Sequence, residues 1–197
     1  MGKIFLLMGK SSSGKDTIYR ELIKTKELGL KKIVSYTTRP MREGETDGVQ
    51  YLFKNEEEYK KLRADNKIIE ERAYDTKCGI WRYFTADDGQ IDLKDGDYLI
   101  IGTLESYCYI RDYFGKDNVV PVYIDTSAKI RLERAMHREE QQEKPRYDEM
   151  CRRFLADEED FSDAKLSDAK IEKRFENNAE IEDCIKEITE YIAQKIR

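Results

Sequence analysis

The sequence predicts an α/β protein with a parallel sheet covered by helices on both faces, an inserted mixed α+β subdomain and a helical lid. Three observations support this prediction. Short apolar runs alternate with helical segments along most of the chain, which is typical of parallel sheets. The first apolar run leads into a turn rich in glycine and serine. From residue 37 to about residue 90 the composition changes to turn residues, charges and aromatics, which indicates the insertion.

The strands are expected where short runs are bounded by turn residues. Four such runs cover residues 3–8, 32–35, 98–101 and 118–124, and residues 170–175 are interpreted as a last strand. Pro121 in the fourth run is more tolerable near the start or edge of a strand than in its middle.

Helices are expected between and after these strands. The first follows the glycine-rich turn and extends to about residue 27, and others cover residues 105–113, 127–137 and a stretch from about 147. Ser127 is a candidate N-cap. The closing helix is amphipathic because isoleucines recur at spacings of four, three, four and four residues. These are Ile181, Ile185, Ile188, Ile192 and Ile196.

The 197 residues fit a single domain, given roughly 100–200 residues per domain. We expect a core of residues 1–36, 91–137 and 154–197, an inserted subdomain at 37–90 and a lid at 138–153. The lid begins with a wholly polar stretch containing a proline, which is typical of a mobile loop between two helices.

Composition excludes several classes of function. The 36 basic and 41 acidic residues give a net charge of −5, which argues against general nucleic-acid binding. The apolar opening run, Ile4 to Met8, is far shorter than the roughly 18 residues of a membrane span, so we expect a cytoplasmic protein without a membrane partner. The four cysteines form no CxxC pair, and the single histidine, His137, leaves little material for a Ser–His pair.

A phosphate-binding loop is predicted between the first strand and the first helix. The spacing Gly-x4-Gly-Lys lets backbone N–H groups surround an anion, the helix N-terminus adds positive dipole, and Lys15 adds a full charge. The sheet is therefore expected to be of the P-loop NTPase type. The residues expected to bind the nucleotide are Gly9, Lys10, Ser11, Ser12, Ser13, Gly14, Lys15, Asp16 and Thr17.

Asp16 stands where a Ser or Thr would normally bind Mg²⁺. A carboxylate is a good hard ligand for Mg²⁺, directly or through water. An acidic residue is also favoured at a helix start through the helix dipole. Both interpretations of Asp16, metal ligand and helix cap, stay open.

The segment from Ser35 to Tyr51 has the chemistry of an acceptor site. Arg39 and Arg42, three residues apart beside hydroxyl groups, can make planar bidentate contacts to a phosphate monoester. Two glycines within the segment allow close backbone turns, and the Tyr51 hydroxyl offers another donor.

This segment resembles the acceptor-binding pattern of the guanylate kinase family, Ser-x-Thr-Thr-Arg-x-x-Arg-x-Gly-Glu-x-x-Gly-x-x-Tyr, at every fixed position. The resemblance implies transfer of the ATP γ-phosphate to GMP with Mg²⁺, by a monomer or homodimer whose partners are small nucleotides. It also implies that Glu70 accepts hydrogen bonds from guanine N1 and N2. The implied GMP-binding residues are Ser35, Arg39, Arg42, Tyr51, Glu70, Tyr83 and Thr85.

The resemblance weakens after Glu70. Ile101 and Thr103 stand where the family has two acids, one associated with the metal and one with the base. Asp16 is expected to replace the missing negative charge near Mg²⁺. The same combination is a feature of ribose 1,5-bisphosphate phosphokinase relatives, which generally lack the complete arginine segment and are the alternative.

The region from Arg131 to Arg153 contains seven basic residues. They are either solvated helix faces with i,i+4 pairs or lid groups that reach the transferring phosphoryl group. The resemblance implies the second role for Arg134, Arg138 and Arg153, with Arg152 next, and catalytic roles for Lys15 and Arg39. It implies adenine contact for Asn177. A non-catalytic binding module of the same fold is a further alternative, disfavoured by the intact Gly14-Lys15.

Overall fold

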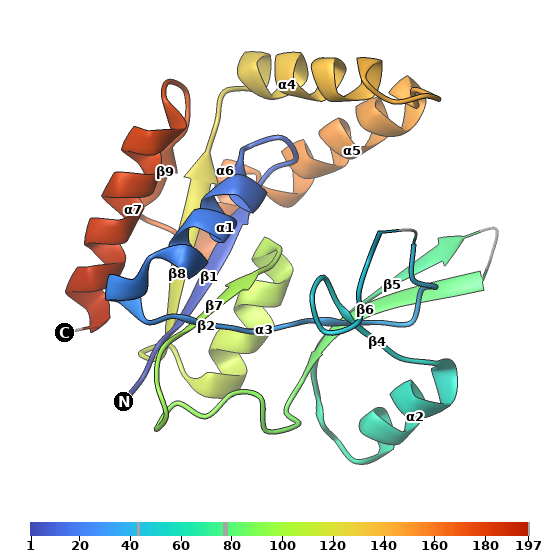
Figure 1. The fold of residues 1–197 in the computed structure, drawn as a ribbon, viewed down its shortest axis with the longest axis vertical. Helices are drawn as coiled ribbons and strands as arrows, with labels where there is room; N and C mark the ends of the chain where they lie inside the picture. Colours follow the sequence, from blue (N-terminus) through green and yellow to red (C-terminus); the bar gives the residue numbers. More distant parts are fainter. Residues whose placement is uncertain (43, 77–78, 197) are drawn as a thin grey trace.

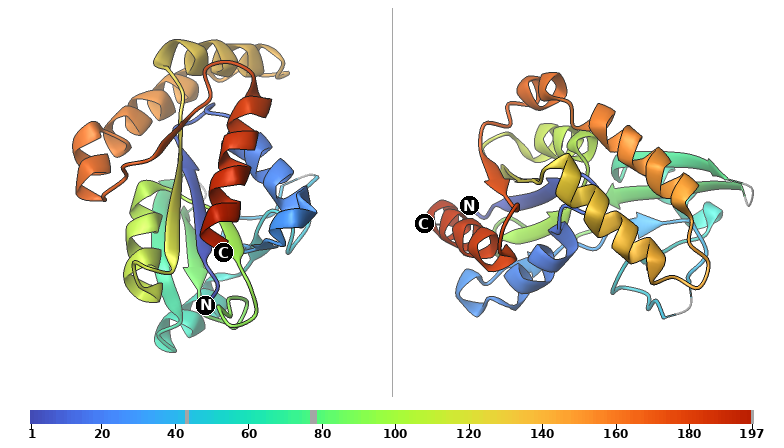
Figure 2. Two further views of the ribbon diagram at one scale, coloured as in Figure 1. Left: turned by 90° about the vertical axis from the view of Figure 1, so that its left-hand side faces the viewer. Right: turned by 90° about the horizontal axis from the view of Figure 1, so that it is seen from above.

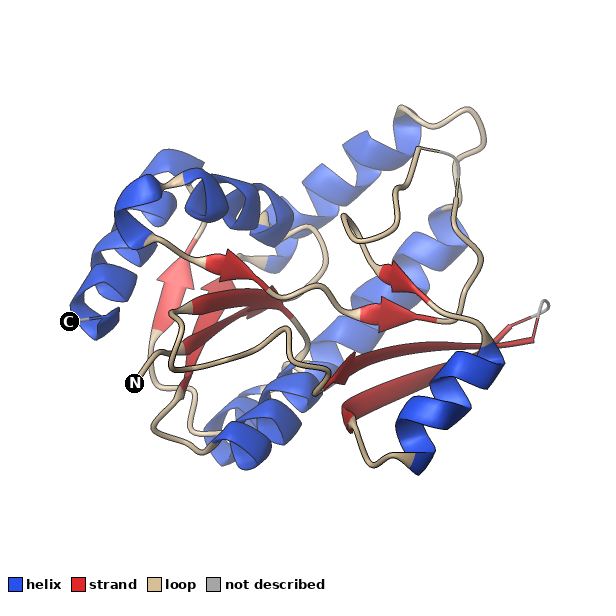
Figure 3. Cartoon of the chain, turned by 60° about the horizontal axis from the view of Figure 1, so that its bottom comes forward, coloured by secondary structure: helices blue, strands red, loops and turns tan. Residues whose placement is uncertain are grey.

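The computed structural model describes residues 1–42, 44–76 and 79–196, which form two sheets (Figures 1 and 3). The larger sheet has the order β2-β7-β1-β8-β9, and all its pairs are parallel. Its strands are β1 (Ile4–Gly9), β2 (Lys31–Lys32), β7 (Tyr98–Ile101), β8 (Val119–Asp125) and β9 (Arg174–Glu176). The smaller sheet contains β4 (Leu52–Phe53), β3 (Tyr36–Thr37), β6 (Gly79–Ala86) and β5 (Ile68–Thr76), in that order.

Helices cover both faces of the larger sheet (Figure 2). α1 (Lys15–Lys24) and α7 (Ile181–Ile196) lie on one face, and α3 (Leu104–Phe114) and α6 (Asp163–Asp168) lie on the other. The remaining helical segments are the 3₁₀ turn η1 (Lys26–Leu28), α2 (Glu56–Ala64), which packs on the smaller sheet, α4 (Ala128–Glu140) and α5 (Tyr147–Asp160). Successive side chains of β1 point to opposite faces. Phe5 and Leu7 pack in one core with α1 and α7, whereas Leu6 and Met8 pack in another with α3 and α6. The predicted α/β fold is confirmed.

Two predicted strands differ from the observed ones. In place of the predicted strand 32–35, the larger sheet contains the shorter strand Lys31–Lys32. The strand is short because the chain leaves that sheet after Ile33 and enters the smaller sheet at Tyr36. The last strand is Arg174–Glu176, not residues 170–175. Lys170 follows α6 in a left-handed conformation with φ 59°, which turns the chain before β9 begins.

Pro121 lies inside β8, in register with Leu6 of β1. The other neighbour, β9, pairs with β8 only from Tyr123 to Asp125. At Pro121 the strand therefore has a partner on one side, and its missing N–H leaves the sheet intact.

The helix before the lid is longer than predicted. α4 continues to Glu140, so the first residues of the expected loop 138–146 are helical. Ser127 occupies the N-cap position without a capping side-chain hydrogen bond; instead its backbone N–H donates to Asn178 Oδ1 at 2.8 Å. His137 is exposed and contacts Gln141.

The smaller sheet has a core of its own. Tyr36 stacks on Phe84 with ring centroids 5.1 Å apart, and Tyr59 of α2 meets Phe84 edge-on. An Asn55–Glu58 capping box starts α2. These contacts support the β5–β6 hairpin that carries the acceptor-side residues.

Among the described residues, no helix is long and apolar enough to cross a membrane. Cys108, Cys151 and Cys184 are free thiols in that part of the chain, and Cys78 lies outside it.

Replacing Ile188 with alanine should lower the free energy of unfolding by about 2–5 kcal/mol, because the side chain is fully buried between α7 and the sheet. Chemical denaturation measures this change. Lys186→Ala on the exposed side of the same helix is the control and should cost under about 0.5 kcal/mol. Equal losses in the two variants would contradict the packing described here.

Candidate active site

The loop between β1 and α1 has the shape of a phosphate cradle. Gly14 is the N-cap of α1 with φ +89°, in the left-handed region that favours glycine. A Cβ at this position would overlap the Asn177 amide. The backbone N–H groups of Thr17 and Ile18 both donate to the Gly14 carbonyl at 3.1 Å, so the helix begins directly at the loop.

The loop is held at the Ser13 carbonyl. Asn177 Nδ2, at the end of β9, donates to it at 2.8 Å, and Thr126 Oγ1, at the end of β8, donates at 3.3 Å. Asn177 is almost fully buried, so the structure places its amide under the loop, and its predicted adenine contact stays a prediction. The hydroxyls of Ser12 and Ser13 are buried and lack hydrogen-bond partners in the described chain. Because buried polar groups are normally hydrogen-bonded, these hydroxyls are candidates for binding a ligand.

Two acids of α5 contact the outer arm of the loop. Asp157 Oδ2 accepts a hydrogen bond from the backbone N–H of Ser11 at 2.6 Å, and Glu158 pairs with Lys10 at 2.7 Å. Glu158 also pairs with Arg131, whose side chain is buried. The helix after the lid is thereby attached to the phosphate loop.

Lys15 and Asp16 carry the charges at the mouth of the loop. Within the described residues Lys15 forms no ion pair, and the exposed Asp16 carboxylate accepts no hydrogen bond. The Arg20 side chain donates instead to the Asp16 carbonyl at 3.3 Å and to Thr17 Oγ1 at 3.4 Å. Burial raises the pKa of Tyr51, and the negative charge of Asp16 adds to this shift. Neither the charge of Lys15 nor that of Asp16 is therefore neutralised by a side-chain partner within the described residues.

Arg39 is the buried centre of the acceptor segment. Its guanidinium makes a bidentate pair with Glu45, at 2.6 and 2.5 Å, and lies over the rings of Tyr51 and Phe53 with centroid distances of 5.2 and 5.3 Å. The hydrogen bonds from Arg39 lower the pKa of Glu45 to about 2. This pair fixes the guanidinium in place.

The neighbouring predicted residues lie around Arg39. Tyr83 packs edge-on against Tyr51, with centroids 5.5 Å apart. Arg42 is exposed, and its backbone N–H donates to Glu45 Oε2 at 2.8 Å. The Ser35 carbonyl accepts from the Leu52 N–H at 2.9 Å, which joins β4 to the segment.

Glu70 and Thr85 lie on paired strands of the hairpin. Thr85 Oγ1 donates to Glu70 Oε1 at 2.8 Å, while Ser106 of α3 and Arg72 donate to Oε2 at 3.2 and 3.3 Å. Ser106 is also within 3.0 Å of Thr103 Oγ1. Arg72 and Ser106 were not expected from the sequence. Arg72 could have been identified from its spacing, because a residue two positions from Glu70 lies on the same face of the strand.

The lid arginines lie at different depths. Arg134 is half-buried, donates to the Asn177 carbonyl at 3.4 Å and has a buried nitrogen with no partner in the described chain. Arg138 is exposed in the last turn of α4. Arg153 and Arg152 both pair with Glu149, and these bonds lower the pKa of that carboxyl to about 2.

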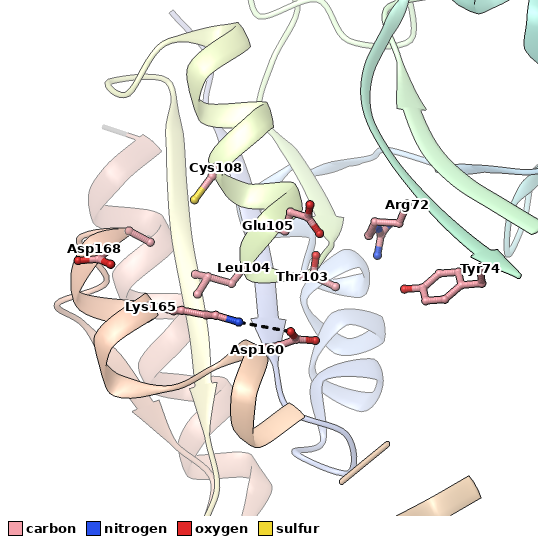
Figure 4. Close-up of a pocket in the computed structure, with 10 residues that line it drawn as sticks. Arg72, Tyr74, Thr103, Leu104, Glu105, Cys108, Asp160, Lys165 and Asp168 are labelled. Carbon is pink, nitrogen blue, oxygen red and sulfur yellow. Dashed lines mark ion pairs between the residues drawn. The ribbon is translucent and has the colours of Figure 1, made fainter. Parts of the chain in front are cut away.

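A cavity of about 520 Å³ lies between β5, the start of α3 and α6 (Figure 4). Its wall includes Arg72, Tyr74 and Thr103. Tyr74 packs edge-on against Tyr83. In Figure 1 the helices α4 and α5 lie above the β5–β6 hairpin.

Part of the chain is similar in sequence to guanylate kinases. The family model described as guanylate kinase matches residues 1–78. The guanylate kinase of Caldanaerobacter subterraneus subsp. tengcongensis is 36% identical over 101 residues, covering 51% of this chain and 47% of that protein. The guanylate kinase of Bacillus subtilis is 37% identical over 73 residues, covering 37% and 36%. By sequence, the similarity to guanylate kinases thus extends over part of the chain.

The likeness to guanylate kinases is strongest in the N-terminal part. The matched part of the chain spans less than half the length of these two curated relatives. The fold extends further: a crystal structure of guanylate kinase from Anaplasma phagocytophilum matches 99% of this chain and 86% of that chain, with a TM-score of 0.67 and 19% identity.

Replacing Glu45 with glutamine should destabilise the fold at neutral pH, because it removes the ionised partner of a buried arginine. The folded-state pKa of about 2 lies below the ordinary value of 4.5, so this stabilisation is present above pH 4.5 and is lost as the pH falls toward 2. Denaturation curves of wild type and Glu45→Gln should differ most near pH 6 and converge on acidification. The exposed Glu57→Gln is the control, and a pH-independent difference would refute the assignment.

Proposed function

We propose that this protein transfers the γ-phosphoryl group of ATP to GMP, giving ADP and GDP. The observation that supports this proposal most is the presence of two phosphate-binding elements, the phosphate loop and the acceptor segment. The phosphate loop carries Lys15, which forms no ion pair among the described residues. In the acceptor segment Tyr51 contacts Arg39 and Tyr83.

In this proposal the two elements bind opposite ends of the reacting pair. The backbone N–H groups of the loop and Lys15 bind the β- and γ-phosphates of ATP. The GMP phosphate is bound by Arg42, by the Tyr51 and Tyr83 hydroxyls and by the Nε of Arg39, which is buried and has no partner among the described residues. Because Glu45 already orients Arg39, that guanidinium is positioned before the acceptor arrives.

The chemistry requires positioning and charge neutralisation more than a general base. An oxygen of the GMP phosphate, already ionised at neutral pH, attacks the γ-phosphorus in line, and ADP leaves. Arg134 extends from α4 toward the end of β9 beneath the loop and is the lid arginine best placed to reach the transferred group. Arg153 would have to leave Glu149 to do the same, whereas Arg138 is already unpaired in the described structure.

Mg²⁺ would be held by one carboxylate together with the ATP phosphates, a common arrangement for this ion. The Asp16 carboxylate fits this role because it is exposed beside the loop and accepts no hydrogen bond in the described chain. When bound, Mg²⁺ neutralises charge on the phosphates. Cytoplasmic location and a monomeric or homodimeric state stay predictions.

Acceptor-dependent release of ADP tests the proposed function. The purified protein with ATP and Mg²⁺ should respond to GMP far more than to AMP, UMP or ribose 1,5-bisphosphate, and dGMP completes the panel. Glu70→Gln should reduce GMP use by roughly 10-fold or more, since a hydrogen bond to a charged group contributes about 1.5–3 kcal/mol. ATP binding should be unchanged. Preference for the ribose bisphosphate, or no acceptor-dependent release, would refute the proposal.

Asp16→Ser should raise the Mg²⁺ concentration needed for half-maximal turnover, because the variant loses the proposed metal carboxylate. Titration of Mg²⁺ at fixed ATP measures the change. The exposed Glu27→Ser is the matched control and should leave the titration unchanged. If Asp16 acts only on the helix dipole, the Mg²⁺ titration will not move and the free energy of unfolding will fall by about 0.3–1 kcal/mol.

A further inference from the structure

Arg72 is a cation in the acceptor region that the family pattern does not assign. Its Nε donates to Glu70 Oε2, and neither terminal nitrogen forms a hydrogen bond within the described residues. The side chain is 20% exposed, whereas that of Glu70 is 2% exposed. Arg72 therefore has free donors at the surface of the site, and Glu70 lies behind it.

The free end of Arg72 lines the cavity. In Figure 4 Arg72 and Tyr74 extend from the strand side toward Thr103 and Glu105 at the start of α3. The charge of Arg72 also opposes the burial-driven rise in the pKa of Tyr51. Arg72 is in register with Tyr83 across the hairpin, as Glu70 is with Thr85, so it lies next to a tyrosine proposed to bind phosphate.

Glu70 by itself has little remaining capacity for a base. A carboxylate has about four acceptor sites, and Thr85, Ser106 and Arg72 already donate to three. Thr103, where the family has a second acid, contributes a hydroxyl and is occupied with Ser106 and the start of α3. A site that recognises a base needs hydrogen-bond donors as well as acceptors. Arg72 is the cation among the residues around Glu70, and its terminal nitrogens are such donors.

We propose that Arg72 is a specificity-determining residue whose terminal nitrogens bind the O6 and N7 atoms of the acceptor base. The planar guanidinium matches these two acceptors of guanine in a bidentate arrangement. Adenine presents an amino donor at position 6 and is disfavoured. Glu70 orients Arg72 through Nε and keeps an acceptor for N1–H. This inference rests on the proposed use of GMP.

The test compares kcat/KM for GMP and for 7-deaza-GMP, which lacks N7, in wild type and Arg72→Gln. Wild type should prefer GMP by about 10-fold. The variant should lose roughly 10- to 100-fold with GMP, the size expected for a charge-assisted hydrogen bond, and much less with 7-deaza-GMP. The preference for GMP should therefore largely disappear.

Several outcomes would overturn the inference. Equal losses with both substrates would show that Arg72 only positions Glu70. The control is Lys165→Gln, which removes a cation from another part of the cavity wall and should leave kcat/KM for GMP and for 7-deaza-GMP near the wild-type values. If Lys165→Gln also lost the preference for GMP, a specific contact between Arg72 and the base would be refuted. Thermal unfolding and ATP binding of each variant verify folding. If wild type does not use GMP, the proposed function and this inference both fail, whereas GMP use with an unchanged preference in Arg72→Gln refutes this inference alone.

Discussion

The burial of β1 on both faces is the constraint on which the rest of the structure depends. Every residue from Ile4 to Met8 is inaccessible, with α1 and α7 on one side and α3 and α6 on the other. Because β7 and β8 pair with β1 in parallel, their carboxyl ends meet at one edge of the sheet. The phosphate loop, Thr126 and Asn177 consequently converge at the Ser13 carbonyl.

Paired charges organise the site around that edge. Arg39 with Glu45, Glu70 with Arg72 and Arg131 with Glu158 each combine a buried group with a more accessible partner. Such pairs add little net stability, because desolvation offsets much of the attraction. Their consequence is orientation: arginines and acids are held before any phosphate or base arrives, which lowers the entropy cost of binding. The Glu158 pairs also connect α5, the helix after the lid, to the phosphate loop.

Local patterns in the sequence were sufficient for much of the fold. The apolar run before Gly9 and the isoleucine spacing of α7 correspond directly to observed elements. Short edge strands were located less well. Residues 32–35 and 170–175 look extended locally, but pairing partners decide where β2 and β9 begin and end. The end of α4 was missed because the polar residues 138–140 carry no apolar periodicity, although they continue the helix.

The sequence by itself determined the phosphate loop and the acceptor segment, since each is a continuous stretch whose chemistry depends on spacing along the chain. Only the tertiary structure decided which charges are free. Arg39 is paired with Glu45, Arg153 with Glu149, and Asn177 is buried under the loop. The contact of Ser106 with Glu70 joins residues 36 positions apart and has no local signature. Such contacts depend on how the hairpin packs against α3, which spacing within one segment does not specify.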